Sequence, residues 1–209
     1  VSKALLVRFA KKLGLSGYSE LKARIKIEIQ EQNGEIKGFL QMMTDSYHKM
    51  MDDLNKKDLS TFFERLYTAK RVFIYGSGSS QARVTSEMKR IFLPVREIIS
   101  MHGHDMCYPL KKNAQKDDLV IIISLGGETQ HVVELAKVLR TQGVPMVSIT
   151  RLTSNRLASL CDENLYINSI RFPQNDQIEY ESSTPYFILI EYLYLSYQNY
   201  LLSKNECTK

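Results

Sequence analysis

The sequence is poor in cysteine, and its three cysteines, Cys107, Cys161 and Cys207, are far apart. An odd number without the short spacing of metal ligands argues against a disulfide framework and against a structural zinc site. We therefore expect a reducing compartment, with the cytoplasm as the default location. With 44% hydrophobic and 24% charged residues, the composition is that of an ordinary globular protein.

A long apolar run of the kind that crosses a bilayer is also missing. The most apolar stretch, residues 184–202, contains Glu191 and many tyrosines, which fit poorly with about 20 mainly apolar residues in a membrane. Thr184 and Pro185 are typical of a helix start. We expect a helix buried between the body of the protein and a partner subunit, hence a homodimer or higher homo-oligomer, and no membrane partner.

Acidic residues are scarce in the first segment. Residues 1–31 carry seven basic and three acidic residues, a net charge of +4, whereas the rest of the chain has 21 basic and 20 acidic residues. Within this segment, residues 2–13 predict a short amphipathic helix with Ser2 as its N-cap and Gly14 as its stop. A further helix is expected from Ser19 to about Gln30. The basic excess indicates an anionic polymer as the partner of this segment.

The middle of the chain is organised around residues 118–129. A run of apolar, mostly β-branched residues, Leu119 to Ile123, predicts a strand buried on both faces of a parallel sheet. A short turn follows, and from Thr129 the apolar spacing becomes helical up to Gly143. Such a turn exposes the first free N–H groups of a helix, where an anion is favoured. This pattern predicts a phosphate-binding turn.

A second turn of the same kind lies upstream. Residues 71–75 predict a strand, residues 76–80 a turn rich in glycine and serine, and residues 81–92 a helix that Pro94 helps to end. Further strands are expected at residues 95–100, 145–150 and 164–167. Strands that alternate with helices predict an α/β fold with a doubly wound parallel five-stranded sheet flanked by helices. An all-helical segment precedes it, with helices expected at residues 35–55 and 58–69.

These motifs resemble a known family. Gly76, Gly78 and Ser80 match the first G-x-G-x-S turn of the sugar isomerase (SIS) domain, and Ser124, Gly127 and Thr129 match its S-x-S-G-x-T turn. The chain departs from the pattern at Gly126, where the family has a second hydroxyl. The segment V-S-x-A-x-x-x-R-F-x-x-K-L-G-x-S-G-Y resembles the second half of the helix-turn-helix domain of the RpiR family, whose members carry an SIS domain after it.

The resemblance implies two sets of site residues. The sugar-phosphate site would consist of Gly78, Ser79, Ser80, Ser124, Gly126, Gly127, Glu128 and Thr129. The DNA-binding residues would be Ser2, Lys3, Ala4, Arg8, Lys11 and Lys12, on a recognition helix whose two preceding helices are absent from the sequence. If the missing hydroxyl at Gly126 normally donates to the phosphate, its loss costs about 1.5–3 kcal/mol.

The resemblance further implies a bacterial transcriptional regulator that binds operator DNA and senses a sugar phosphate. Its domains would be residues 1–32 (helix-turn-helix), 33–57 (linker helix) and 58–203 (SIS). The runs R-I-F-L-P and I-I-I-S-L-G-G-E-T resemble the branch that controls maltose and α-glucoside operons, which suggests an α-glucoside 6-phosphate or hexose 6-phosphate as effector. No cofactor, metal or catalytic residue is expected.

Other functions remain as alternatives. An SIS-type isomerase or lyase would need a general base, for which Glu128, Glu179, Glu181, His104 and His131 are available. None of these lies in a catalytic pattern, and the serines of both turns could serve only as helix caps. His102, His104 and Asp105 lack further metal ligands at a usual spacing. Gln81 replaces the last glycine of a dinucleotide-binding turn, and the lysine of a P-loop is missing.

Overall fold

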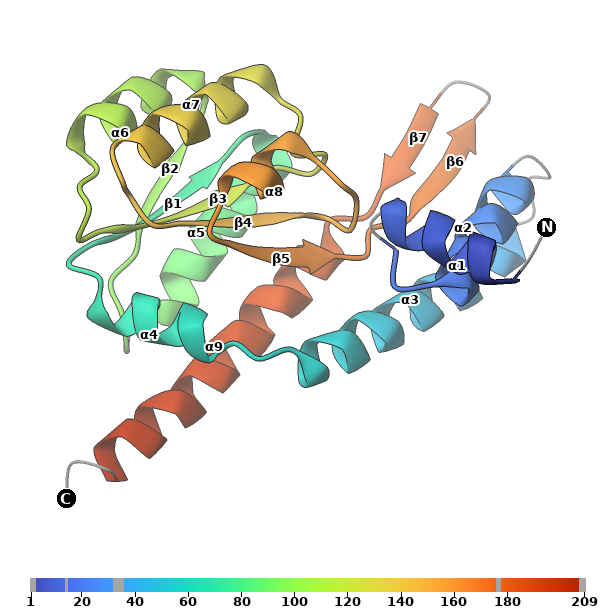
Figure 1. The fold of residues 1–209 in the computed structure, drawn as a ribbon, viewed down its shortest axis with the longest axis horizontal. Coiled ribbons are helices and arrows are strands. Elements are labelled where there is room, and N and C mark those ends of the chain that lie inside the picture. Colours follow the sequence, from blue (N-terminus) through green and yellow to red (C-terminus); the bar gives the residue numbers. More distant parts are fainter. Residues whose placement is uncertain (1–2, 14, 32–35, 176–177, 207–209) are drawn as a thin grey trace. The chain divides into compact units, whose positions relative to one another are not determined.

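The computed structural model describes residues 3–13, 15–31, 36–175 and 178–206 (Figure 1). Within these ranges only the backbone is described for Lys3 and for residues 27–31, 36–37, 173–175, 178–179 and 205–206. The chain divides into two compact units. The first comprises residues 1–57, 152–154 and 168–185, and the second comprises residues 58–151, 155–167 and 186–209.

The second unit is built on a five-stranded parallel sheet. Its strands are β1 (Val72–Gly76), β2 (Ile99–His102), β3 (Leu119–Ile123), β4 (Met146–Arg151) and β5 (Glu163–Ile167), in the order β2-β1-β3-β4-β5. The chain runs outward from β1 to β2, then returns and continues from β3 in the opposite direction. The expectation of a doubly wound parallel sheet is confirmed.

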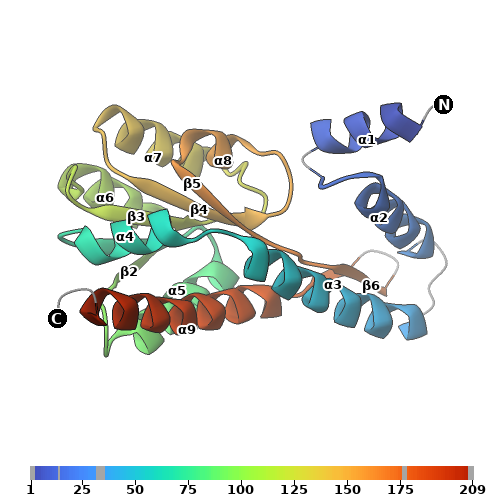
Figure 2. The same ribbon diagram turned by 60° about the horizontal axis from the view of Figure 1, so that its bottom comes forward.

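Helices cover both faces of this sheet. Figure 2 shows α5 (Ser79–Phe92) and α9 (Thr184–Glu206) on one face, and α6 (Cys107–Asn113), α7 (Gln130–Thr141) and α8 (Arg156–Leu160) on the other. Right-handed crossovers explain the division, because the chain reverses its direction across the sheet after β2. Every described residue of β3 is therefore buried. Each fully buried aliphatic side chain stabilises the fold by about 1.5–3 kcal/mol.

The helix before the first strand is α4 (Ser60–Thr68). Leu59 is its N-cap residue, and one position earlier Asp58 Oδ1 accepts a hydrogen bond from Ser60 N at 2.9 Å. Its buried aromatic residue Phe63 packs against Tyr197 of α9, with ring centroids 5.7 Å apart. Among the described helices, none combines the length and apolar character that a bilayer crossing requires.

The first unit contains α1 (Lys3–Lys12), α2 (Tyr18–Glu31), α3 (Ile36–Lys56) and an antiparallel hairpin of β6 (Arg171–Asn175) and β7 (Ile178–Glu181). Helices α1 and α2 pack through three buried residues, Ala10, Leu15 and Leu21. Helix α3 packs on the hairpin: the Phe39 and Phe172 rings meet edge to face at 5.2 Å, and Tyr47 Oη lies 3.2 Å from Ser182 Oγ.

The sequence expectations differ from the structure in three places. Strand β2 begins at Ile99 rather than at residue 95, because the backbone N–H groups of Val95 and Arg96 donate to Phe92 O and so prolong the end of α5. Helix α6 and the hairpin were not expected. Pro173, which has no N–H, interrupts the strand pattern of β6 and hides it from sequence reasoning.

Candidate functional site

The two glycine- and hydroxyl-rich turns lie at the same edge of the sheet. One follows β1 and leads into α5, and the other follows β3 and leads into α7. Since β1 and β3 are neighbouring parallel strands, their carboxyl ends meet, and Ser77 N donates directly to Ile123 O at 3.1 Å. This is the point where the strand order reverses, and ligands of open α/β sheets bind in the crevice at this point.

The first turn depends on close approach of its backbone to α5. A Cβ on Gly76 would lie 2.8 Å from the backbone carbonyl carbon of Gln81, closer than real Cβ contacts. Gly78 occupies the N-cap position of α5 in an extended conformation and, as a glycine, has no side chain with which to cap this helix end. The N–H groups of the first helical turn, which includes Ser79 and Ser80, therefore remain available to an anion.

The second turn contains a buried hydroxyl. Ser124 is 1% exposed, and its Oγ has no hydrogen-bond partner among the residues that the structure describes. A buried polar atom without a partner costs about 1–3 kcal/mol, so it calls for an explanation. Its neighbour Gly126 is open, because an added Cβ would meet nothing within 4 Å. Thr129, the exposed N-cap residue of α7, makes no side-chain cap hydrogen bond within the described structure.

Gly127 is in contact with the segment that follows β4. Its φ of 65° lies in the left-handed region that favours glycine. A Cβ at this position would overlap with the side chain of Asn155, which is buried and caps α8 by accepting from Ala158 N at 2.8 Å. Leu157 N also donates to Gly127 O at 3.0 Å. The loop after β4 thus fixes the conformation of the second turn.

Glu128 is engaged by Arg156, which follows Asn155. Its carboxylate accepts from Arg156 N at 2.8 Å and from Arg156 Nε at 2.6 Å, and its backbone oxygen accepts from Nη2 at 2.9 Å. The hydrogen bond from the Arg156 backbone, followed by that from its guanidinium, lowers the pKa of Glu128. A carboxylate with a lowered pKa is poorly matched to general base catalysis near neutral pH. Sequence reasoning missed both Asn155 and Arg156, although an asparagine before a short helix is a recognised capping signal.

The other candidate acids and bases are two histidines in contact with each other and the glutamates of the hairpin. The rings of His104 and His131 meet edge to face at 5.0 Å, and burial followed by the charge of His104 lowers the pKa of His131. Glu181 accepts from Arg171 at 3.3 Å within the hairpin, and the side chain of Glu179 lies outside the described residues. In the described part of the chain, no group of three or more histidine, cysteine, aspartate or glutamate residues could hold a metal ion.

The basic residues implied for DNA binding lie on α1. Ala4, Arg8, Lys11 and Lys12 are exposed, whereas the side chain of Lys3 and the whole of Ser2 lie outside the described residues. By contrast, Ala10 of the same helix is buried in the cluster through which α1 packs on α2. The described basic side chains can therefore reach an anionic surface.

Comparison with known proteins gives two family matches that together cover most of the chain. The SIS domain matches residues 65–194, and the helix-turn-helix domain of the rpiR family matches residues 1–32. The HTH-type transcriptional regulator GlvR of Bacillus subtilis is 34% identical over 201 residues, which cover 96% of this chain and 79% of GlvR. An uncharacterized HTH-type transcriptional regulator of Caldanaerobacter subterraneus is 26% identical, and the match covers 80% of this chain and 64% of that protein.

Solved structures show the same fold. The sugar isomerase domain of an RpiR transcription factor from Sphaerobacter thermophilus matches 76% of this chain and 88% of its own, with a TM-score of 0.63 and 17% identity. The Vibrio vulnificus NanR protein, complexed with ManNAc-6P, matches 99% of this chain and 81% of its own, with a TM-score of 0.62 and 20% identity. Because the sequence relatives are named as transcriptional regulators, the expectation of a regulator rather than an isomerase is supported. The chain belongs to the RpiR family of helix-turn-helix transcriptional regulators that carry an SIS domain.

Proposed function

We propose that the regulator binds a sugar phosphate between the turns after β1 and β3 and that this binding alters its affinity for operator DNA. The observation that carries the proposal is the buried Ser124 hydroxyl without a described partner, directly after β3 and next to the end of β1. A phosphate accepts hydrogen bonds from hydroxyl and N–H groups, and both are available here. In this proposal Ser80, Ser124 and Thr129 donate to the phosphate, and the remaining positions, Gly78, Ser79, Gly126, Gly127 and Glu128, contribute their backbone.

The effector that we propose is an α-glucoside 6-phosphate or another hexose 6-phosphate. Two features support this class: the resemblance of the run from Ile121 to Thr129 to regulators of α-glucoside operons, and the ManNAc-6P complex of NanR, a protein of the same fold. A ligand changes operator binding only if it binds one arrangement of the protein better than another. The operator would be contacted by Ser2, Lys3, Ala4, Arg8, Lys11 and Lys12, in a homodimer acting in the cytoplasm.

Replacing Thr129 by valine is expected to weaken sugar-phosphate binding by roughly ten-fold to a hundred-fold. The substitution keeps the shape of the side chain and removes one hydroxyl, and a hydrogen bond to a charged group is worth about 1.5–3 kcal/mol. Affinity would be measured by calorimetry or by thermal shift with glucose 6-phosphate and maltose 6′-phosphate.

Thr141 provides a matched control for this substitution. It lies at the other end of α7, where its hydroxyl donates to Lys137 O at 3.0 Å. A Thr141→Val variant should bind sugar phosphates as the wild type does. Equal affinities of the wild type and Thr129→Val for every sugar phosphate that binds would contradict the proposed site.

Replacing Gly126 by serine is expected to strengthen sugar-phosphate binding by about ten-fold. A Cβ at Gly126 meets nothing within 4 Å, and the residue does not adopt a left-handed conformation, so the change costs little stability. The new hydroxyl stands where the SIS pattern has one and can add a charge-assisted hydrogen bond. Gly17→Ser, another position with open space around it, serves as the control. Unchanged binding in Gly126→Ser would show that the phosphate does not reach this part of the turn.

A further inference from the structure

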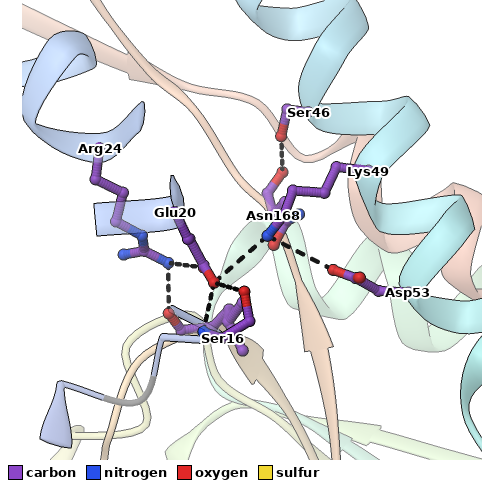
Figure 3. A network of polar contacts seen from close by, with 8 residues as sticks. Ser16, Glu20, Arg24, Ser46, Lys49, Asp53 and Asn168 are labelled. Atoms are coloured by element: carbon purple, nitrogen blue, oxygen red, sulfur yellow. Dashed lines mark hydrogen bonds and ion pairs between the residues drawn. The ribbon is translucent and has the colours of Figure 1, made fainter. Parts of the chain in front are cut away.

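A network of charged residues joins α2 to α3 in the first unit (Figure 3). At its centre is Glu20 of α2, which is 8% exposed and accepts hydrogen bonds from Ser16 N and Ser16 Oγ, both at 2.7 Å. Lys49 of α3 lies 3.4 Å from Glu20 and 3.7 Å from Asp53. Burial alone would raise the pKa of Glu20, but the Ser16 hydrogen bonds and the nearby cations outweigh it and lower the pKa.

Arg24 extends this network to the loop after β4. It lies one helical turn after Glu20, with Nη2 3.8 Å from the Glu20 carboxylate. The same nitrogen donates to the backbone oxygen of Leu152 at 2.6 Å. A short bond from a guanidinium to a carbonyl is stronger than a neutral hydrogen bond. The position of the Leu152 peptide is therefore tied to α2, a helix of the DNA-binding segment.

The other end of the same loop holds the second turn of the candidate site. We call residues 152–156 the strut. They comprise the last residues before α8 and its first residue, Arg156. Asn155 packs against Gly127, and Arg156 binds Glu128. The boundary between the two units falls at the peptide bond between Ser154 and Asn155. This connection is covalent. The strut thus contacts α2 at Leu152 and the second turn at Asn155 and Arg156.

We infer that the strut carries effector binding to the DNA-binding segment, with Arg24 and Arg156 as positioning residues at its two ends. This inference rests on the proposed function. A phosphate beside Thr129 would attract the Arg156 guanidinium, which is exposed and now pairs with Glu128. Arg156 thus has two alternative anionic partners, and a change of partner moves the strut and the Leu152 oxygen that Arg24 holds. Coupling needs such an element with two arrangements that both sites influence.

The test uses hydrogen exchange of the 209-residue chain without ligand, so it is independent of the effector. In Arg24→Gln, the amides of Arg156 and Leu157, which donate to Glu128 and Gly127, should exchange roughly five-fold faster or more, the lower end of ordinary coupling. Lys22→Gln, an exposed change on the same helix, should leave them unaltered. Unchanged exchange in Arg24→Gln would overturn the inference.

A second variant, at the other end of the strut, is needed because Arg24→Gln removes contacts of α2 itself. Arg156→Gln alters an exposed side chain and should speed exchange at the amides of residues 22–26 in α2. Arg140→Gln is its control, because Arg140 also donates to a backbone oxygen, that of Ser159 at 2.9 Å, without touching the turn. No change in α2 for Arg156→Gln would overturn the inference.

A final arm adds glucose 6-phosphate or maltose 6′-phosphate to the wild type. Absence of any thermal shift would count against the proposed function, while the variant arms still report on the strut. Binding that changes the exchange of residues 124–129 and also of residues 22–26 is the expected result. Binding that changes only residues 124–129 would overturn the inference and leave the proposed site intact.

Discussion

Gly127→Ala is expected to lower the free energy of unfolding by about 2–3 kcal/mol and to abolish sugar-phosphate binding. The left-handed conformation costs an alanine about 1–2 kcal/mol. The new Cβ also overlaps with Asn155, and displacing this cap of α8 costs about 1 kcal/mol more. Since the turn must move to relieve the overlap, the N–H groups and hydroxyls that it presents lose their arrangement. Urea unfolding followed by circular dichroism measures the first effect, and calorimetry measures the second.

Substitutions at two other glycines separate the cost of the left-handed conformation from the cost of the overlap with Asn155. Gly126→Ala adds a Cβ in open space and should change stability by less than about 0.5 kcal/mol. Gly143 has a φ of 72°, but a Cβ there meets only the flexible side chain of Lys116 at 3.5 Å. Gly143→Ala should therefore show the conformational cost without the overlap. If Gly127→Ala were no more destabilising than Gly143→Ala, the proposal that the Asn155 side chain fixes the conformation of the turn would be wrong.

Arg71→Ala is expected to destabilise the second unit by about 3 kcal/mol, the lower end of the range for removing one partner of a buried ion pair. The side chain of Asp118 is fully buried and accepts from Arg71 Nε at 2.9 Å and Nη2 at 2.7 Å, and from Gln115 N at 2.8 Å. Without Arg71 the carboxylate is left buried without a cation. The Arg71 side chain is 36% exposed, which places the estimate at the lower end.

The neighbouring pair provides a control for this prediction. Lys70 lies 3.7 Å from Asp117, and both side chains are more than half exposed. Lys70→Ala should change stability by less than about 1 kcal/mol, as for other surface pairs. Similar losses in Arg71→Ala and Lys70→Ala would contradict the role assigned to the buried pair.

The contribution of the Arg71–Asp118 pair to stability should depend on pH. Burial alone would raise the pKa of Asp118, but hydrogen bonds from Arg71 and Gln115 outweigh it, so the pKa is lowered. A lowered pKa contributes stability above the unfolded value of about 3.9, and this contribution is lost as the pH falls through the folded pKa. The wild type should therefore lose more stability than Arg71→Ala on acidification below about pH 4.

The strands and the turns could be predicted because their signals are local. The run from Leu119 to Ile123 is apolar on both faces, and a strand of this kind belongs in a parallel sheet. Glycines and hydroxyls after two such strands indicated the two turns, and parallel strands present their carboxyl ends at one edge. The family resemblance added the order of the domains. The identity of the site residues stays a prediction that ligand binding must test.

The contacts that hold the second turn could not be predicted, because they join residues that are distant in sequence. Asn155 meets Gly127 only because β4 lies beside β3. Arg24 and Leu152 are separated by 128 positions, and no local sequence pattern predicts the hydrogen bond between them. The hairpin of β6 and β7 was missed for a different reason, since its arms are short and contain Pro173. Long-range pairing depends on the fold, whereas a turn depends mainly on its own residues.

Amide NMR spectra of the chain titrated with glucose 6-phosphate and maltose 6′-phosphate test the proposed site most directly. A phosphate bound between the two turns should shift the amides of residues 77–80 and of residues 124–129 together, with one common dissociation constant. Sulfate at the same concentration distinguishes recognition of a sugar phosphate from general anion binding. Shifts in only one turn, or shifts confined to other parts of the chain, would contradict a shared phosphosugar site at the ends of β1 and β3.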